Sequence, residues 1–341
     1  MLHNSKIECI FVSQLKTMKF KNVTQLLDHF KDDATCKAHL EFKRWNGTPC
    51  CHHCGSLRVY RTNRGFKCAE KLCGKKFTVT TGTMYENTKL PLRIWFAAVY
   101  LISSSKKGLS SLQAARQLGI TQKTAWFLNH RIREMLSDKS PLLLKGLVSA
   151  DESYLGGKEA NKQKGKRQRN NKGKYLNTKT PVIGIVEDGG NVVLKVVPWV
   201  TKRTISKLFE VHIAKGSTMV TDSYGLYHHL GKSEFYKHEI VNHRKEEYVN
   251  KDGFSTNRIE GCFSILKRGI YDIYHSVSPK HLQRYCNEFS SRYNSRKVTD
   301  DVRFEKAIEN CAGRLKYNDL KNTDYSMFIN KIESDDNTAS I

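Results

Sequence analysis

Hydrophobic and polar positions alternate along residues 256–270 with the period of an α-helix. The apolar positions, at spacings of four, three and four, are Ile259, Phe263, Leu266 and Ile270. This spacing places them on one face, which must be buried against another element. A polar row beside them consists of Asn257, Glu260, Ser264 and Lys267. Thr256 or Ser255 is expected to cap the start of the helix. On this pattern alone, an ordinary amphipathic surface helix is a sufficient explanation.

The same kind of pattern between residues 140 and 297 predicts the strands of a sheet. Apolar runs typical of strands occupy residues 143–150, 181–187, 191–198, 217–222 and 239–241. Asp188-Gly-Gly190 predicts a hairpin between the second and third runs. Helices are expected from Thr201 to about Ala214 and again from residue 256. One strand is expected to end at Asp151 and another at Asp222, so the region is predicted to be an α/β domain.

Residues 1–138 are predicted to be mostly helical, apart from a cysteine-rich segment. Residues 109–126 match a helix-turn-helix: small residues in the first helix, Gly119 in the turn, and Thr121 as the cap of a basic second helix. That second helix is expected to present Gln122, Lys123 and Arg131 to DNA. Helical hairpins that do not bind DNA share this pattern, so the alternative stays open.

The most informative feature of the composition is its net charge, which bears on the partner of the protein. The chain has 58 Lys and Arg against 33 Asp and Glu, a net charge of +25. Such a surplus favours a polyanionic partner, namely nucleic acid, although a solvated basic surface is the alternative. Residues 158–174 are Lys- and Arg-rich with almost no apolar residue, which predicts a mobile loop on DNA phosphates. Its expected phosphate contacts are Lys164, Lys166, Arg167 and Arg169.

Targeting and membrane signals are not found. The longest apolar run, residues 94–102, is too short to cross a bilayer, and the N-terminus lacks a signal-peptide pattern. We therefore expect a soluble intracellular protein without a membrane partner. In a bacterial host it would be cytoplasmic and associated with the nucleoid, and in a eukaryotic host it would be nuclear.

Four of the ten cysteines have the spacing of a zinc site. They form two pairs, Cys51 with Cys54 and Cys68 with Cys73, separated by two predicted short strands. Four thiolates suit a structural, tetrahedral Zn²⁺ and leave no open position for catalysis. The competing ligands in this segment are Cys50, His52 and His53, and plain buried cysteines are the remaining alternative. A zinc ribbon is the preferred interpretation.

Two aspartates at strand ends and a glutamate on a neighbouring helix suggest a second metal site. Asp151, Asp222 and Glu260 would supply the hard oxygen ligands that Mg²⁺, or Mn²⁺, prefers. Two such ions neutralise the attacking and leaving oxygens of a phosphodiester. Lys267, two helical turns after Glu260, would meet a phosphate, with Arg268 beside it. An isolated aspartate at a strand end is more often a cap or a turn residue.

Several ordered motifs resemble the DDE transposases of bacterial insertion sequences that carry an N-terminal zinc ribbon, and their eukaryotic Merlin-type relatives. The motifs are Asp151-Glu-Ser-Tyr-x-Gly-Gly157, Thr221-Asp-Ser-Tyr224, Val241-Asn-His243, Glu247-Tyr-Val249, Thr256-Asn-x-Ile-Glu260, Lys267-Arg-Gly269, Tyr274-His-x-x-Ser-x-Lys-His-Leu282, Tyr285-x-Asn-Glu-Phe289 and, after the ribbon, Phe77-Thr-Val-x-x-Gly-Thr83 with Trp95. The resemblance covers about residues 35–297. It implies a ribonuclease H-like catalytic fold and Mg²⁺-dependent strand cleavage and transfer at terminal inverted repeats.

The third metal ligand is not the same residue type throughout that family, where it is described as Asn, Glu or His. Asn257 and Glu260 share the polar row, and we favour Glu260 because a carboxylate is the better Mg²⁺ ligand. His243 and His275 also resemble family positions, with phosphate contact and packing as open roles. The expected partners are double-stranded DNA and further copies of the chain, since pairing two element ends usually takes two protomers.

The predicted domains follow from these signals. They are a helical lead-in (1–46), a zinc ribbon (47–90), a helix-turn-helix region (91–140), a ribonuclease H-like catalytic domain with its basic loop (141–297) and a polar C-terminal tail (298–341), disordered at its end. Two alternatives to a transposase remain: a nuclease of the same fold, and a transposase-derived DNA-binding regulator without activity.

Overall fold

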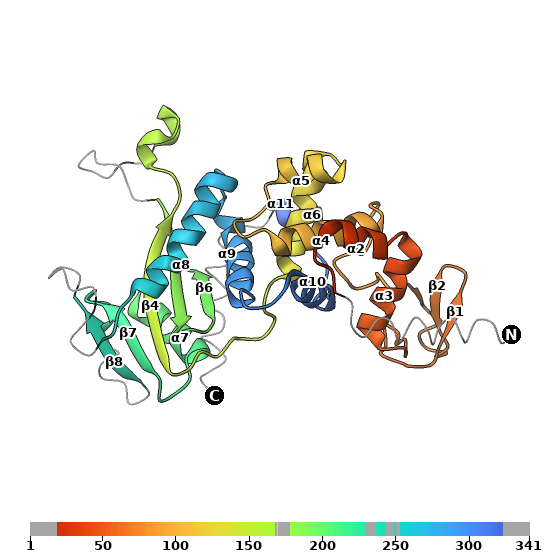
Figure 1. The fold of residues 1–341 in the computed structure, drawn as a ribbon, viewed down its shortest axis with the longest axis horizontal. Helices are drawn as coiled ribbons and strands as arrows, with labels where there is room; N and C mark the ends of the chain where they lie inside the picture. Colours follow the sequence, from red (N-terminus) through yellow and green to blue (C-terminus); the bar gives the residue numbers. More distant parts are fainter. Residues whose placement is uncertain are drawn as a thin grey trace. The chain divides into compact units, whose positions relative to one another are not determined.

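The structure is a computed structural model that describes residues 19–167, 169, 178–228, 236–242, 249 and 253–322. The chain divides into two compact units. The helical unit comprises the described residues up to 136 together with 296–320, and the sheet unit comprises those of 137–295 (Figure 1). No helix in the described ranges is long and apolar enough to cross a membrane.

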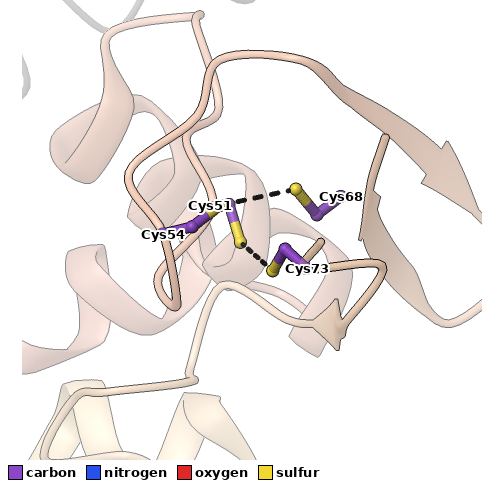
Figure 2. Close-up of side chains that lie close together, drawn as sticks. All are labelled: Cys51, Cys54, Cys68 and Cys73. Carbon is purple, nitrogen blue, oxygen red and sulfur yellow. Dashed lines mark hydrogen bonds between the residues drawn. The ribbon is translucent and has the colours of Figure 1, made fainter. Parts of the chain in front are cut away.

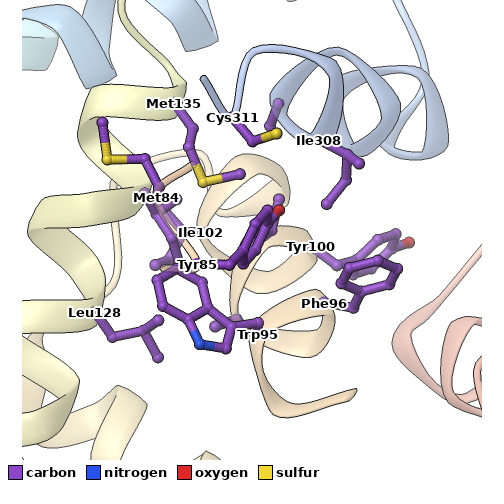
Figure 3. Packing of buried hydrophobic residues seen from close by; sticks show 14 of the residues in the cluster. Met84, Tyr85, Trp95, Phe96, Tyr100, Ile102, Leu128, Met135, Ile308 and Cys311 are labelled. Carbon is purple, nitrogen blue, oxygen red and sulfur yellow. The ribbon is translucent and has the colours of Figure 1, made fainter. Parts of the chain in front are cut away.

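The helical unit is organised around α4 (Leu92–Ser104), in which nine of the thirteen residues are buried. A helix that is apolar on nearly every side needs neighbours on every side. The surrounding helices are α2 (Val23–His29), α3 (Asp33–Trp45), α5 (Ser111–Leu118), α6 (Gln122–Met135) and α10 (Asp300–Glu309). Figure 3 shows Trp95, Phe96 and Tyr100 of α4 packed among side chains from α6 and from the C-terminal segment. This core unites elements from both ends of the described chain.

The C-terminal segment differs from the expected polar tail. Residues 298–322 include α10 and a short helix α11 (Tyr317–Asn322), and Phe304 and Ile308 of α10 are fully buried in the core around α4. Backbone bonds also join the segment to the turn at residues 82–84, with Met84 N–H donating to Cys311 O at 2.8 Å. The segment is polar on average, but α10 has one apolar face, and this face is buried. The remainder, 323–341, lies outside the described residues.

A partly buried ion pair fastens α10 to α3, and it gives the helical unit a pH dependence. Glu305 contacts Lys43 Nζ at 2.9 Å and His39 Nε2 at 3.1 Å. Burial raises the pKa of Glu305, but the hydrogen bonds and charges of His39 and Lys43 outweigh it, so the pKa is lowered overall. A lowered pKa means that Glu305 stabilises the fold above its unfolded pKa, and that this stability is lost as the pH falls through the folded value.

We expect Glu305→Gln to lower the free energy of unfolding by about 2 kcal/mol at pH 7, and by progressively less as the pH falls through the folded pKa of Glu305. Glu309→Gln is the matched control, because Glu309 contacts the same lysine at 2.8 Å but is 52% exposed. It should cost at most about 0.5 kcal/mol. Urea unfolding followed by tryptophan fluorescence measures both. Equal losses for the two variants, or a loss for Glu305→Gln that persists at low pH, would contradict the assignment.

The predicted helix-turn-helix is present as α5 and α6, and its local signals explain why. Ser110 caps α5 by accepting from Gln113 N–H, and Thr121 caps α6 by accepting from Thr124 N–H. Between them Gly119 has a left-handed backbone (φ 65°), which glycine adopts without a steric penalty. Apolar faces of both helices join the core around α4.

The ribbon is a three-stranded antiparallel sheet. Its strands are β1 (Val59–Thr62), β2 (Gly65–Cys68) and β3 (Lys76–Phe77). The buried core of this sheet is small: Phe66 and Phe77 stack with ring centroids 5.5 Å apart, beside Cys51 and Cys68. So little apolar burial is insufficient to hold three short strands, and a further cross-link is needed.

The sheet unit contains a five-stranded mixed sheet in the order β6-β5-β4-β7-β8. The strands are β4 (Leu147–Leu155), β5 (Thr180–Glu187), β6 (Val192–Val196), β7 (Thr218–Asp222) and β8 (Lys237–Val241). Strand β5 pairs antiparallel with both β4 and β6, while β7 pairs parallel with both β4 and β8. Three antiparallel strands continued by parallel ones, with helices on both faces, form a ribonuclease H-like fold.

Each face of the sheet has its own core and its own helices. On one face, Val148 and Ala150 of β4 pack with α7 (Lys202–His212). On the other face, Leu155 and residues of β5 and β6 pack with α8 (Asn257–Arg268) and α9 (Pro279–Asn294). The apolar row predicted for residues 256–270 is therefore buried on the sheet, with Ile259 and Leu266 fully covered.

Side-chain amides of α9 bind the backbone of β6 at the outer side of the sheet. Asn294 accepts from Val192 N–H at 2.7 Å and donates to Val192 O at 3.1 Å. Gln283 accepts from Val196 N–H at 2.8 Å and donates to Leu194 O at 3.0 Å. These backbone groups point away from β5, so α9 satisfies them in place of a further strand.

Candidate zinc centre and active site

The four predicted zinc ligands converge at the end of the ribbon. Their sulfur atoms all lie within 4.8 Å of one another (Figure 2). Cys51 Sγ and Cys73 Sγ are 3.8 Å apart, and Cys54 Sγ and Cys68 Sγ are 3.6 Å apart. Ligands about 2.3 Å from a tetrahedral zinc lie about 3.8 Å from each other. The separations therefore fit a four-cysteine zinc site that cross-links the ribbon.

The chemistry of the donors also fits zinc. Burial opposes ionisation of Cys51, but N–H groups of His53 and Cys54 donate to its sulfur and lower the pKa of the thiol to about 7. A backbone N–H bond from Ser56 lowers the pKa of Cys54, but burial and the neighbouring thiols outweigh it and raise the pKa to about 12, and burial also raises the pKa of Cys68. A zinc ligand must be deprotonated, so Cys51 is the thiol that ionises most readily, and a bound cation would offset the charge of the others. Neither competing histidine joins the cluster; the ring of His52 instead lies against Gly82, where a Cβ atom would be 2.0 Å from it.

Asp151 lies in the middle of β4, and not at its end as expected. The strand continues to Leu155 because β5 pairs with it along its whole length, including Asp151 with Gly184. The apolar run that suggested an end at Asp151 stops there because the second half of the strand, Asp151-Glu-Ser-Tyr-Leu155, begins with three polar residues. Asp151 is half-buried, and its carboxylate accepts from Glu152 N–H at 2.8 Å.

Asp222 is the last residue of β7, as predicted, and the sheet register brings it beside Asp151. The described parallel pairing of β4 with β7 ends at Ser149 with Val220. Two residues further along each strand are Asp151 and Asp222. Side chains alternate between faces, so both carboxylates emerge on the face that Ser149 and Val220 share. Asp222 is half-buried and accepts from Tyr224 N–H at 3.0 Å.

The start of α8 is fixed on that same face. Ser149 Oγ donates to Ser255 O at 3.2 Å, which ties the residues before α8 to the strand of Asp151. Thr256 precedes the helix but makes no capping bond; its hydroxyl instead donates to Glu260 Oε1 at 3.0 Å. Thr256 is thus buried between the sheet and Glu260, and it orients the carboxylate.

A glycine lets α8 lie this close to Asp151. Gly184 is the cross-strand partner of Asp151, and its side faces α8. A Cβ atom there would lie 2.6 Å from Ile259 Cδ1 and 2.8 Å from Phe263 Cζ. Real contacts are not that short, so a side chain at 184 must displace the Ile259 and Phe263 side chains by which α8 packs on the sheet. The glycine brings the helix that carries Asn257 and Glu260 to the aspartates.

We expect Gly184→Ala to destabilise the packing of α8 by about 1–3 kcal/mol through this clash. Gly261→Ala is the control, because Gly261 lies on the exposed face of the same helix, where an added methyl group would meet no atom within 4 Å. That change should stabilise the helix by about 0.5–1 kcal/mol. Hydrogen exchange of the α8 amides measures both effects. Protection unchanged in Gly184→Ala would refute the close-packing argument.

The three acids do not form one ligand cluster in the structure. Among the described residues, the four cysteines are the group of three or more whose ligand atoms converge. Glu260 and Asn257 are both exposed, one helical turn apart at the start of α8. Lys267 is exposed two turns further on, about 10 Å along the axis. Arg268 is held by its own helix, donating to Ser264 Oγ at 3.0 Å.

Sequence reasoning missed Glu152 and Tyr227, which lie under the aspartates on the opposite face. Tyr227 OH donates to Glu152 Oε2 at 2.5 Å. Burial raises the pKa of Glu152 to about 7, and the charges of Asp151 and Asp222 add to the effect, while the hydrogen bond counteracts it. The sequence contained a signal for this position. Side chains alternate between the faces of a sheet, so Glu152 lies on the same face as Val148 and Ala150, which are buried in a core.

The predicted DNA contacts of the helix-turn-helix divide into two groups. Gln122 and Lys123 are exposed at the start of α6. Arg131 is not available to DNA: it is 6% exposed and donates to Leu315 O and Glu86 O, both at 3.1 Å. Its guanidinium also stacks on Phe127 at 4.6 Å. The residue lies on the core side of α6, and it joins three segments of the helical unit.

The basic loop is partly described, and that part is more ordered than a mobile loop. Short 3-10 turns span Glu159–Asn161 and Lys164–Lys166. Glu159 is buried and bound by Lys162 Nζ at 2.6 Å and by the hydroxyl of Thr178. The four predicted phosphate contacts are exposed, namely Lys164, Lys166, Arg167 and Arg169. Residues 168 and 170–177 lie outside the described ranges.

Three further residues of the motifs, His243, His275 and Glu288, differ in their surroundings. His275 is exposed with a left-handed backbone (φ 58°), directly after a π-helix at Gly269–Ile273. His243 lies outside the described residues. Glu288 is fully buried, where Tyr274 OH donates to it at 2.8 Å and Arg292 pairs with it. Glu288 therefore fixes the end of the π-helix to α9.

Comparisons with known proteins place both parts of the chain in one family. Residues 143–294 match the family described as ISXO2-like transposase domain, and residues 31–76 match the transposase zinc-ribbon domain. A stretch of 262 residues is 28% identical to an uncharacterized protein in transposable element ISH50 of Halobacterium salinarum, covering 73% of this chain and 86% of that protein. The crystal structure of a pre-cleavage Mos1 transpososome covers 68% of this chain and 82% of its own, at 11% identity and a TM-score of 0.23.

The fold and the cysteine cluster define a ribonuclease H-like protein with an N-terminal zinc ribbon. The two family matches occur in that same order along the chain. The chain belongs to the zinc-ribbon DDE transposases of insertion sequences.

Proposed function

We propose that this transposase binds the terminal inverted repeats of a mobile element and catalyses Mg²⁺-dependent strand cleavage followed by transfer of the 3′ hydroxyl into target DNA. The observation that supports this most directly is the register of two half-buried aspartates on adjacent parallel strands, with the start of α8 fixed on their face. Asp151, Asp222 and Glu260 would hold Mg²⁺ or Mn²⁺, with Asn257 as the alternative third ligand.

The chemistry that we assign to the metal is neutralisation of the charge on the attacking and leaving oxygens of the phosphodiester. The protein's own part is positioning. Asp151 and Asp222 are held by backbone N–H groups, and the hydroxyl of Thr256 orients Glu260. Lys267 has no partner among the described residues and is free to meet a phosphate two turns along α8.

The DNA-binding part of the proposal rests on charge and on exposed basic groups in both units. The net charge is +25, and the exposed groups include Lys123 on α6 and the described cations of the loop after β4. Pairing two element ends would require at least two copies of the chain, so we propose a homo-oligomer on DNA. The zinc would support the ribbon and take no part in the chemistry.

The test is a joining assay with purified full-length protein, a labelled duplex ending in the element's inverted repeat, and a supercoiled target plasmid. A transposase joins the labelled 3′ end to the target when Mg²⁺ is present. Cleavage without joining would instead favour a nuclease of the same fold. Binding without either reaction would favour a DNA-binding regulator.

A further inference from the structure

A cleft of about 270 Å³ lies between the zinc ribbon and the turn that follows it. One wall is formed by β2, β3 and the β1–β2 turn, and the other by the turn at residues 78–81, which contains three threonines. We call this space the threonine cleft. All of its walls belong to the helical unit, so its shape does not depend on the other unit.

The threonine hydroxyls have a hydrogen left over for an outside acceptor. Thr78 Oγ1 lies 2.9 Å from Thr80 Oγ1 and 3.2 Å from Thr81 Oγ1. Thr81 Oγ1 also accepts from Thr78 N–H at 2.9 Å. Three hydroxyls carry three hydrogens, and the two contacts among them use two. At least one hydroxyl hydrogen therefore remains to be donated.

The charges around the cleft favour an anion. Arg64 and Lys76 line it, both exposed, and neither has an acidic partner among the described residues. Arg61, by contrast, is bound to Glu41 at 2.7 Å and covers Phe66. The one acid in the lining, Glu86, is already neutralised: one oxygen contacts Arg314 at 3.1 Å, and the other accepts from Gly82 N–H at 2.9 Å.

The floor of the cleft is apolar. It consists of the stacked rings of Phe66 and Phe77, each 3% exposed. Two unpaired cations and a spare hydroxyl donor match a phosphate, the charged group that repeats along a DNA strand. A free base would need an edge of matched donors and acceptors, and the cleft offers mainly donors.

We propose that the threonine cleft holds one phosphate of the backbone of double-stranded DNA, with Arg64 and Lys76 on its charge and a threonine hydroxyl on an oxygen. This deepens the proposed function and rests on it. Contacts to the backbone position a protein without reading sequence, so the cleft would set where the ribbon lies along the duplex.

The test measures DNA affinity of the zinc-loaded full chain by fluorescence anisotropy at salt concentrations between about 50 and 200 mM. The double variant Arg64→Gln with Lys76→Gln should lower the magnitude of the slope of log K against log salt by about 0.9, the value for one phosphate. Thr80→Val removes a hydroxyl without changing charge, so it should weaken binding about threefold to tenfold at every salt concentration and leave the slope unchanged.

The double variant Lys31→Gln with Lys37→Gln is the matched control, since both are exposed lysines of the same unit that do not line the cleft. A second measurement replaces single phosphates of the DNA by uncharged methylphosphonates. One replacement should weaken binding by the wild type but not by the cleft double variant. A slope of the cleft double variant equal to that of the double variant Lys31→Gln with Lys37→Gln overturns the cleft assignment. Failure of the wild type to bind any duplex overturns the proposed function itself.

Discussion

Replacing Asp151 with asparagine should reduce strand cleavage and joining by at least about a thousandfold while leaving DNA binding intact. An amide keeps the shape of the carboxylate but removes the charge that attracts a divalent cation. Lost charge stabilisation of several kcal/mol corresponds to a factor of about 10³ in rate. The backbone bond from Glu152 N–H to the remaining oxygen can persist, so the strand should stay folded.

The joining assay and a Mg²⁺ titration by calorimetry should be run side by side. Asp272→Asn serves as the control, because Asp272 is an exposed acid of the same unit in the π-helix after α8. It should react at the wild-type rate. If Asp151→Asn still joins DNA within tenfold of wild type, Asp151 is not a metal ligand.

The same assay decides between the two candidates for the third ligand. If Glu260 holds the metal, Glu260→Gln should lose about as much activity as Asp151→Asn, and Asn257→Ala should stay within about tenfold of wild type. The reverse order would assign the ligand to Asn257. A Thr256→Val variant separates orientation from ligation, because it removes only the hydroxyl that donates to Glu260.

Removing zinc should unfold the ribbon and leave the sheet unit intact. The three strands are short, and their buried core amounts to two cysteines and two phenylalanines. Structural zinc contributes roughly 10–16 kcal/mol of apparent free energy in small domains, far more than such a core provides. Cys68→Ser should therefore lower the zinc content from one ion per chain to none and abolish the exchange protection of β1, β2 and β3.

Cys50→Ser is the control for this experiment, because Cys50 is outside the converging group. It should keep its zinc and its protected strands. Amides of β4 and β5 should be protected equally in both variants, since they belong to the other unit. Retention of zinc by Cys68→Ser would mean that a histidine replaces the sulfur, and the four-cysteine assignment would then be wrong.

The sequence predicted the elements well where one physical signal decided the outcome. The cysteine spacing located the zinc site, and the period of Ile259, Phe263 and Leu266 correctly predicted a helix with one buried face. The aspartate that ends β7 was also placed correctly. In each case the deciding residues lie close together in sequence.

Predictions were weaker where partners distant in sequence decide. Arg131 has the composition of a DNA contact, but carbonyl groups from Glu86 and Leu315 bind it in the core. The stretch after residue 298 is polar on average, yet Phe304 completes a core formed by helices near the start of the chain. Nothing in the sequence near Gly184 indicates that α8 packs on it, because the residues it contacts, Ile259 and Phe263, lie about 75 residues further along the chain.

The amides that α9 places on β6 have a consequence for crowded DNA. A free outer strand is a template on which another chain can add its own strand, and such growth leads to aggregation. Gln283 and Asn294 already occupy four of the backbone groups that a foreign strand would need, namely the N–H groups of Val192 and Val196 and the C=O groups of Val192 and Leu194. If copies of the chain assemble on DNA as proposed, their sheets would be kept from fusing through this side.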